Sequence, residues 1–212
     1  MPFLQRKQST PHYKLRSEIE QLLRTAGIHT GMWARSGNLQ ESKRATPTED
    51  GGFEWVLTTE KPTLVWDWKR WEFVYEVLLA DGMLVPANGQ VVLLDSHSRY
   101  SVKDVLGHVR DFSETDAGEY AARSGIVYFA EDADSQAAKQ KVEGRHITDG
   151  SVGYKQIKSI WIPEGDEASV RGRTFEGPLR VTYEWSLMEF SITPIGADVL
   201  AKVRDLHSLC GA

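Results

Sequence analysis

The chain has 212 residues, 41% of them hydrophobic and 26% charged, which suits one sizeable domain rather than two. Its formal net charge of -5 and pI near 5.7 argue against a protein that mainly binds nucleic acid, because phosphate contacts need an excess of basic residues. A single cysteine excludes an internal disulfide, and no apolar run reaches the roughly 20 residues of a membrane span. The N-terminus lacks the apolar core of a signal peptide, so we expect a soluble intracellular protein.

The first fifty residues carry few signals. Apolar residues at helical spacing predict a short amphipathic helix over residues 13–26, which docks either on the domain or on a partner. Residues 30–52 are polar and rich in Gly, Ser, Thr and Pro, as in a flexible linker. We therefore divide the chain into an N-terminal helix and linker, 1–52, and one domain, 53–212.

From residue 53 the apolar pattern changes to the period of two that is typical of strands. The first half of the domain is expected to hold strands at 53–59, 63–66, 71–77, 83–85, 90–94 and 102–109, the last with a bend at Gly107. The turn dipeptides Asp81-Gly82 and Asn88-Gly89 separate some of them.

The second half adds a polar connection over 111–125, a strand over 126–130, and a helix over 135–142 capped by Asp132 or Asp134 and ended at Gly144. Further strands are expected at 152–162 (with a bulge near Gln156), 179–185 and 187–195, a loop at 163–178, and an amphipathic helix at 197–206. This pattern favours a mostly β fold with flanking helices, an antiparallel barrel or sandwich, over a doubly wound sheet.

Two stretches could carry chemistry. Ser151 lies between Gly150 and Gly153 at the start of a strand, where its hydroxyl has little steric cover. His97 directly follows the strand at 90–94, so a rigid element would hold it while its ring reaches a cleft. An ordinary turn at Ser151 and a surface histidine at His97 are the alternatives.

Three motifs in this order resemble the prohead proteases of tailed bacteriophages, the capsid-maturation serine proteases whose fold is similar to herpesvirus assemblin. They are Val-Leu-Leu-Asp-Ser-His97, Ser151-Val-Gly-Tyr, and Leu-Met-Glu189-Phe-Ser-Ile-Thr-Pro-Ile-Gly-Ala-Asp, within a matching stretch from about Asp81 to Val203. The resemblance implies an assemblin-like antiparallel β-barrel in which Ser151 is the nucleophile and His97 its base. Residues 1–52 have no counterpart in it.

The resemblance leaves the third catalytic residue and the oxyanion donors open. Assemblin has a second histidine as the third residue, whereas the matching strand here carries Glu189, and a carboxylate can perform the same electrostatic role. Asp95 and His108 compete for that role. The oxyanion donors could come from the Arg171-Gly172-Arg173 loop, from Arg180, or from the amide of Gly153.

The expected function is therefore a serine endopeptidase that cleaves the scaffold protein, and the major capsid protein, inside the assembling procapsid in the host cytoplasm. No cofactor or metal is expected, because the histidines show no ligand spacing. Neither nucleic acid nor a membrane is expected as a partner, and self-association is compatible with the sequence. The alternative is a catalytically inactive β-barrel module that binds scaffold or capsid subunits.

Overall fold

A computed structural model describes residues 47–198 and 201–203. The expected helix at 13–26 and most of the linker lie outside these residues. The described part is mostly β, as expected. Its strands are β1 (Phe53–Thr59), β2 (Thr63–Asp67), β3 (Glu72–Leu78), β4 (Met83–Leu84), β5 (Val91–Asp95), β6 (Val105–Ala117), β7 (Tyr120–Phe129), β8 (Asp149–Ile162), β9 (Glu167–Val170), β10 (Arg173–Glu176) and β11 (Leu179–Thr193).

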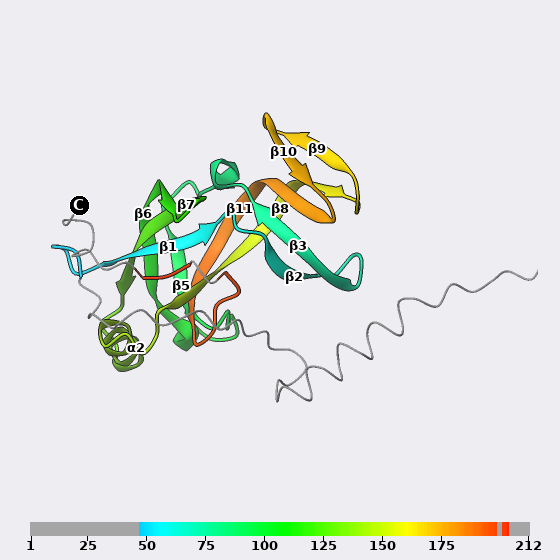
Figure 1. Ribbon diagram of the computed structural model, residues 1–212. Coiled ribbons are helices and arrows are strands. Elements are labelled where there is room, and N and C mark those ends of the chain that lie inside the picture. The colour runs from blue at the N-terminus through cyan, green and yellow to red at the C-terminus, as the bar shows by residue number, and fades with distance from the viewer. Residues whose placement is uncertain (1–46, 199–200, 204–212) are drawn as a thin grey trace, which may run out of the picture. The chain divides into compact units, whose positions relative to one another are not determined.

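Nine strands form one sheet in the order β1-β7-β6-β5-β11-β3-β2, with β4 and β8 also paired to β11 (Figure 1). The expected antiparallel barrel is not what forms, for two reasons. Strand β11 runs parallel to β3, β4 and β5. The sheet also does not close: β1 and β8 are linked through residues 201–203, which make isolated bridges to Trp55 and Asp149.

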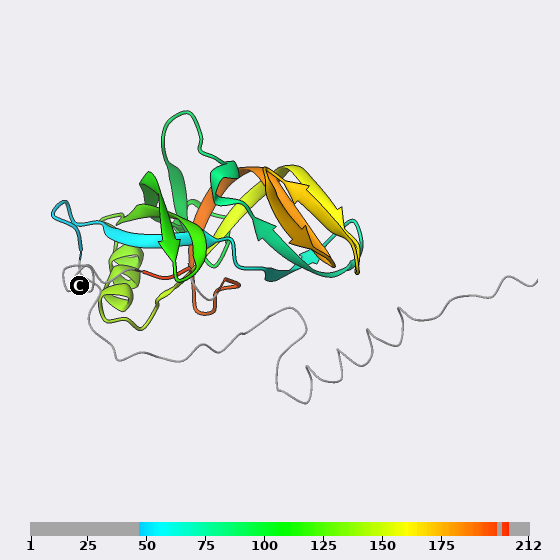
Figure 2. The ribbon, with the colours of Figure 1, turned by 45° about the horizontal axis from the view of Figure 1, so that its top comes forward.

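Two segments that were expected to be irregular are hairpins. The polar stretch 111–125 belongs to the β6–β7 ribbon, in which a register shift between Arg110 and Ser113 accommodates Asp111 at a positive φ of 57°. The expected loop at 163–178 contains the β9–β10 hairpin. Figures 1 and 2 show this hairpin at the opposite end of the domain from helix α2. The strands expected at 179–185 and 187–195 are one continuous strand, β11.

Helix α2 (Ala133–Glu143) lies where the sequence predicts a helix, and Asp132 caps it by accepting hydrogen bonds from the amides of Asp134 and Ser135. Two 3-10 turns, η1 (Ala80–Gly82) and η2 (Val102–Asp104), are the other helical segments of the described chain. None of these helices is long and apolar enough to cross a membrane. The helix expected at 197–206 is not observed in its described part, because Lys202 and Val203 form extended bridges.

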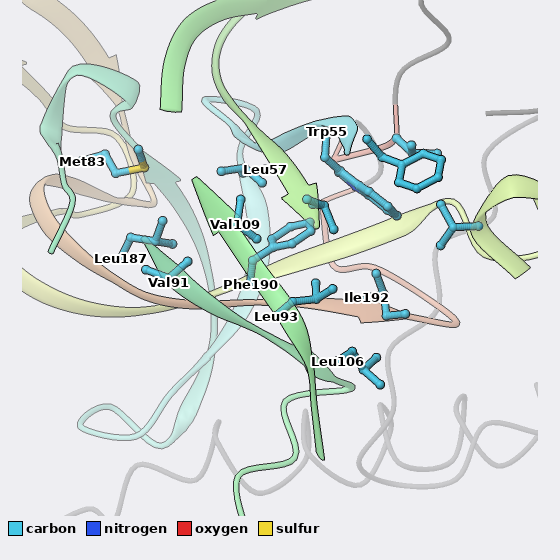
Figure 3. Packing of buried hydrophobic residues seen from close by; sticks show 14 of the residues in the cluster. Trp55, Leu57, Met83, Val91, Leu93, Leu106, Val109, Leu187, Phe190 and Ile192 are labelled. Atoms are coloured by element: carbon cyan, nitrogen blue, oxygen red, sulfur yellow. The ribbon is translucent and has the colours of Figure 1, made fainter. Parts of the chain in front are cut away.

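The main core determines which face of β11 remains for other side chains. Leu187, Phe190 and Ile192 are buried in this core with Trp55 and Leu93 (Figure 3). Side chains alternate along a strand, so Glu189 and Ser191, on either side of Phe190, point to the face opposite Phe190 and Ile192. A register shift between Leu187 and Glu189 resets the alternation at that point. The opposite face of β11 therefore carries Glu189 and Ser191.

Candidate active site

His97 lies in a strained turn at the end of β5. Ser96 and His97 both have positive φ, 48° and 61°, and the amide of Ser98 donates to the carbonyl of Asp95 at 2.8 Å. Tight turns with two left-handed residues normally use Asn and Gly, and a left-handed non-glycine residue costs about 1–3 kcal/mol. Two amides tie this turn to β11: Ser96 donates to the Ile192 carbonyl and His97 to the Ser191 hydroxyl, both at 3.0 Å.

This turn brings the His97 ring to Glu189, where His97 Nδ1 lies 2.6 Å from Glu189 Oε1. Glu189 is 2% exposed. Its Oε1 also accepts a hydrogen bond from Arg99 Nη2 at 3.0 Å, and its Oε2 accepts one from Ser191 Oγ at 2.8 Å. Burial alone would raise the pKa of Glu189, but its bonds and charge interaction with His97 and its bonds to Ser191 and Arg99 outweigh burial and lower it.

These contacts define the proton arrangement of the pair. Because the pKa of Glu189 is lowered, the group is a carboxylate at neutral pH and can only accept hydrogen bonds. His97 Nδ1 must therefore donate to it, and the neutral ring carries its lone pair on Nε2. A histidine held in this tautomer by a buried carboxylate is arranged to act as a general base.

Gly153 makes room for this group from the neighbouring strand. It is the Cα partner of Glu189 in the β8–β11 ladder. A Cβ at this position would lie 1.9 Å from Glu189 Oε1 and 2.6 Å from Arg99 Nη2. The carboxylate and the guanidinium thus occupy the space that a side chain at residue 153 would need.

Ser151 lies next to this group on β8. It is the Cα partner of Ser191, just as Gly153 is of Glu189, so its side chain leaves the sheet on the face that carries Glu189 and Ser191. Residues directly opposite each other in an antiparallel pair have Cβ atoms about 5 Å apart. Within the described residues, the Ser151 hydroxyl makes no hydrogen bond to the His97 ring.

A small cleft opens beside Ser151. Its volume is about 100 Å³. The cleft is lined by residues from four strands and two loops: Ser151, Val152 and Tyr154 of β8, residues 57–59 of β1, Thr63 and Val65 of β2, Glu76 and Leu78 of β3, and Lys61, Ala197 and Asp198. The cleft lies between β1, β2, β3 and β8, where β1 and β8 are not paired with each other.

The other candidates for the third residue are not bonded to the His97 ring. Asp95 accepts a hydrogen bond from the Ser96 hydroxyl at 2.8 Å and is exposed. His108 stacks on Tyr128 with ring centroids 5.1 Å apart. Glu189 is the candidate that the fold brings to His97.

The arginines expected to serve the oxyanion are engaged elsewhere. Arg171 donates to the carbonyl of Asp81, and Arg173 pairs with Glu60. Arg180 lies in a buried cluster, bonded to both oxygens of Glu76 and to Asp67. Of the candidate donors, the Gly153 amide is the one that lies on β8 two residues from Ser151.

Sequence reasoning missed two members of the site, Arg99 and Ser191. Ser191 could have been found, because it follows Glu189 by two residues and so shares its face of a strand. Arg99 gave no such signal in its polar loop. Among the described residues, no cluster of three His, Cys, Asp or Glu side chains is arranged to hold a metal ion.

The lowered pKa of Glu189 predicts how stability depends on pH. A carboxyl whose folded-state pKa is lowered binds fewer protons in the folded than in the unfolded state, so stability rises with pH across the interval between the two values. Glu189 should therefore stabilise the fold above its ordinary pKa of 4.5, and this contribution should disappear as the pH falls through the folded-state value. Urea unfolding of wild type and Glu189→Gln at pH 7, 5, 4 and 3 measures this contribution. The difference in the free energy of unfolding between the two proteins should shrink as the pH falls, and a difference that does not change with pH would contradict the prediction.

No protein-family model, curated protein or solved structure gives a significant match to this chain.

Proposed function

We propose that this protein is a serine endopeptidase in which Ser151 is the nucleophile, His97 the general base and Glu189 the residue that orients His97. The observation that carries the proposal is the bond between His97 Nδ1 and the buried Glu189, made from a turn with two left-handed residues. Strained backbone persists where the surrounding structure holds it in place, and it is concentrated at functional sites.

The proposed reaction follows from these positions. Ser151 Oγ attacks the scissile carbonyl carbon while His97 Nε2 takes the hydroxyl proton, and the protonated ring then gives this proton to the departing amine. The acyl group left on Ser151 is released by water, which His97 deprotonates in turn. Glu189 stabilises the protonated imidazole in both steps.

The proposed substrates come from the order of the three motifs. Their resemblance to the prohead proteases supports the scaffold protein and the major capsid protein as substrates, cleaved inside the procapsid in the host cytoplasm. We further propose that the domain is related to the assemblin-like proteases, although its sheet is open. A substrate chain enclosed with the protease is present at a high effective concentration, so modest intrinsic efficiency suffices.

Labelling with a serine-directed fluorophosphonate tests the nucleophile. We expect one phosphonyl group on the wild type, located at Ser151 by peptide mass spectrometry, and none on Ser151→Ala, which lacks the attacking oxygen. In cells that co-express a scaffold protein, wild type should yield cleaved scaffold and Ser151→Ala intact scaffold. Ser159→Ala, also on β8, is the matched control and should behave as wild type. Undiminished cleavage by Ser151→Ala would remove Ser151 from its role.

A binding module without catalysis is the second candidate, and it is favoured by the missing hydrogen bond between Ser151 and His97. Catalytic hydrogen bonds are often long without substrate and form in the substrate complex. The two candidates differ in outcome: an inactive module would bind scaffold or capsid subunits, leave them intact, and take up no phosphonate at Ser151.

A further inference from the structure

Arg99 shares one carboxylate oxygen with the candidate base. Its Nη2 donates to Glu189 Oε1 at 3.0 Å, the same atom that accepts Nδ1 of His97 at 2.6 Å. The Arg99 side chain is 59% exposed, whereas that of Glu189 is 3% exposed. One buried carboxylate thus serves two cationic partners when His97 is protonated.

The loop that carries Arg99 is fixed on both sides. His97 is tied to β11 as described above, and the carboxylate of Asp104 accepts hydrogen bonds from Ser98 Oγ at 2.7 Å and from the amides of Tyr100 and Ser101. The backbone on either side of Arg99 is therefore anchored. This anchoring lowers the entropy cost of holding the guanidinium at Glu189.

Arg99 approaches the His97 ring from the side of Glu189. Nδ1 and Nε2 lie on opposite sides of the imidazole ring, and Arg99 binds the carboxylate on the Nδ1 side. Its Nη2 would lie 2.6 Å from a Cβ of Gly153, the ladder partner of Glu189. Arg99 is thus placed to act on the reaction through Glu189.

We propose that Arg99 is a positioning residue that shares Glu189 with His97 and thereby sets the pH range in which His97 acts as a base. This inference rests on the proposed serine protease function. A fixed positive charge on the carboxylate weakens the attraction that Glu189 exerts on a protonated imidazole. His97 is then free to accept a proton from Ser151 at lower pH than it would be beside Glu189 alone.

Other charged groups lie on the elements next to the pair but do not bond to its carboxylate. On the His97 segment these are Asp95, Lys103 and Asp104, of which Asp95 and Asp104 accept the hydrogen bonds given above. On β8, Asp149 pairs with Lys202, and Lys155 is exposed. On β6, His108 is the Cα partner of Val92, which itself pairs with Glu189, and burial and Arg110 lower its pKa.

The test is the rate of fluorophosphonate labelling of Ser151 between pH 5 and 9. In Arg99→Gln the pH of half-maximal labelling should move upward, so that labelling at pH 6 is about three- to tenfold slower than in wild type, as expected for loss of a partly exposed neighbouring charge. Arg99→Lys keeps the charge and should restore the wild-type midpoint. Lys103→Gln removes a charge from the same loop without touching Glu189, and His108→Gln removes the nearby titrating ring; both should keep the wild-type midpoint.

The outcomes separate the two proposals. If wild type is not labelled at Ser151, the protease function and this inference fail together. If Ser151 is labelled but Arg99→Gln keeps the wild-type midpoint, or Lys103→Gln shifts it equally, only the inference on Arg99 fails. A purely structural role of Arg99 would lower the melting temperature and the labelled fraction without moving the midpoint.

Discussion

Glu189→Gln is expected to slow the labelling of Ser151 by about ten-thousandfold at pH 7.5, the loss found when the orienting carboxylate of a triad becomes an amide. A glutamine can present its N–H to Nδ1 of His97, which favours the tautomer with its proton on Nε2. That tautomer has no lone pair facing Ser151. The amide also cannot stabilise the protonated ring, so both functions of Glu189 are lost.

The two competing candidates are the controls for this variant. Asp95→Asn and His108→Gln should label within about twofold of wild type, because neither residue is bonded to the His97 ring. Circular dichroism and melting temperatures of all three variants show whether the fold is retained. If Glu189→Gln labels within tenfold of wild type while folded, or if Asp95→Asn loses as much as Glu189→Gln, the role of Glu189 is wrong.

The motifs named Glu189 as the partner of His97, and the structure brings the two together, but the residue pattern alone left Asp95 and His108 as competitors. His97 follows a strand and Glu189 lies in one, and period-two patterns are enough to show this. Asp95 and His108 are much nearer to His97 in sequence. The choice between them depends on the parallel pairing of β5 with β11, which aligns Glu189 with Val92, and on the register shift before Glu189. Such long-range register has no local sequence signal.

The wrong predictions of secondary structure have physical causes. The distal part of β6 holds mainly polar residues that are exposed or half-buried, so it lacks the apolar alternation by which a strand is recognised. At the C-terminus, Val203 has helical spacing with its apolar neighbours, but it is buried in the main core and pairs with Trp55. Tertiary contacts decided the conformation there, as they commonly do over local propensity.

The three arginines that were expected to serve the oxyanion illustrate a further limit of prediction from sequence. Arg171, Arg173 and Arg180 drew attention through their position in the resemblance, yet each has an acidic partner of its own in the fold. Arg99 stands in a polar loop that resembles any solvated segment. What distinguishes it is a neighbour ninety residues later in the chain, Glu189, whose carboxylate it reaches.

Gly153→Ala tests whether the space opposite Glu189 is essential to the site. The added Cβ would overlap Glu189 Oε1 at 1.9 Å, so the carboxylate must move away from its bonds to His97 and Arg99. A displacement of about 1 Å in a catalytic group can cost about a hundredfold in rate. We expect labelling of Ser151 to fall by about that factor or more. The protein should stay folded, because the overlap is with the ends of two side chains, and that of Arg99 is 59% exposed and free to move.

Gly150→Ala is the matched comparison on the other side of Ser151. Its Cβ would lie 2.1 Å from the Phe190 ring and 2.9 Å from Trp55 Nε1, inside the main core, where overpacking typically costs about 1–3 kcal/mol. Gly150→Ala should therefore lower the free energy of unfolding, measured with urea, more than Gly153→Ala does, while Gly153→Ala loses more labelling. If both variants lost stability and labelling in the same proportion, the glycines would serve packing alone. If instead Gly150→Ala loses more stability and Gly153→Ala loses more labelling, Gly153 belongs to the site and Gly150 to the core.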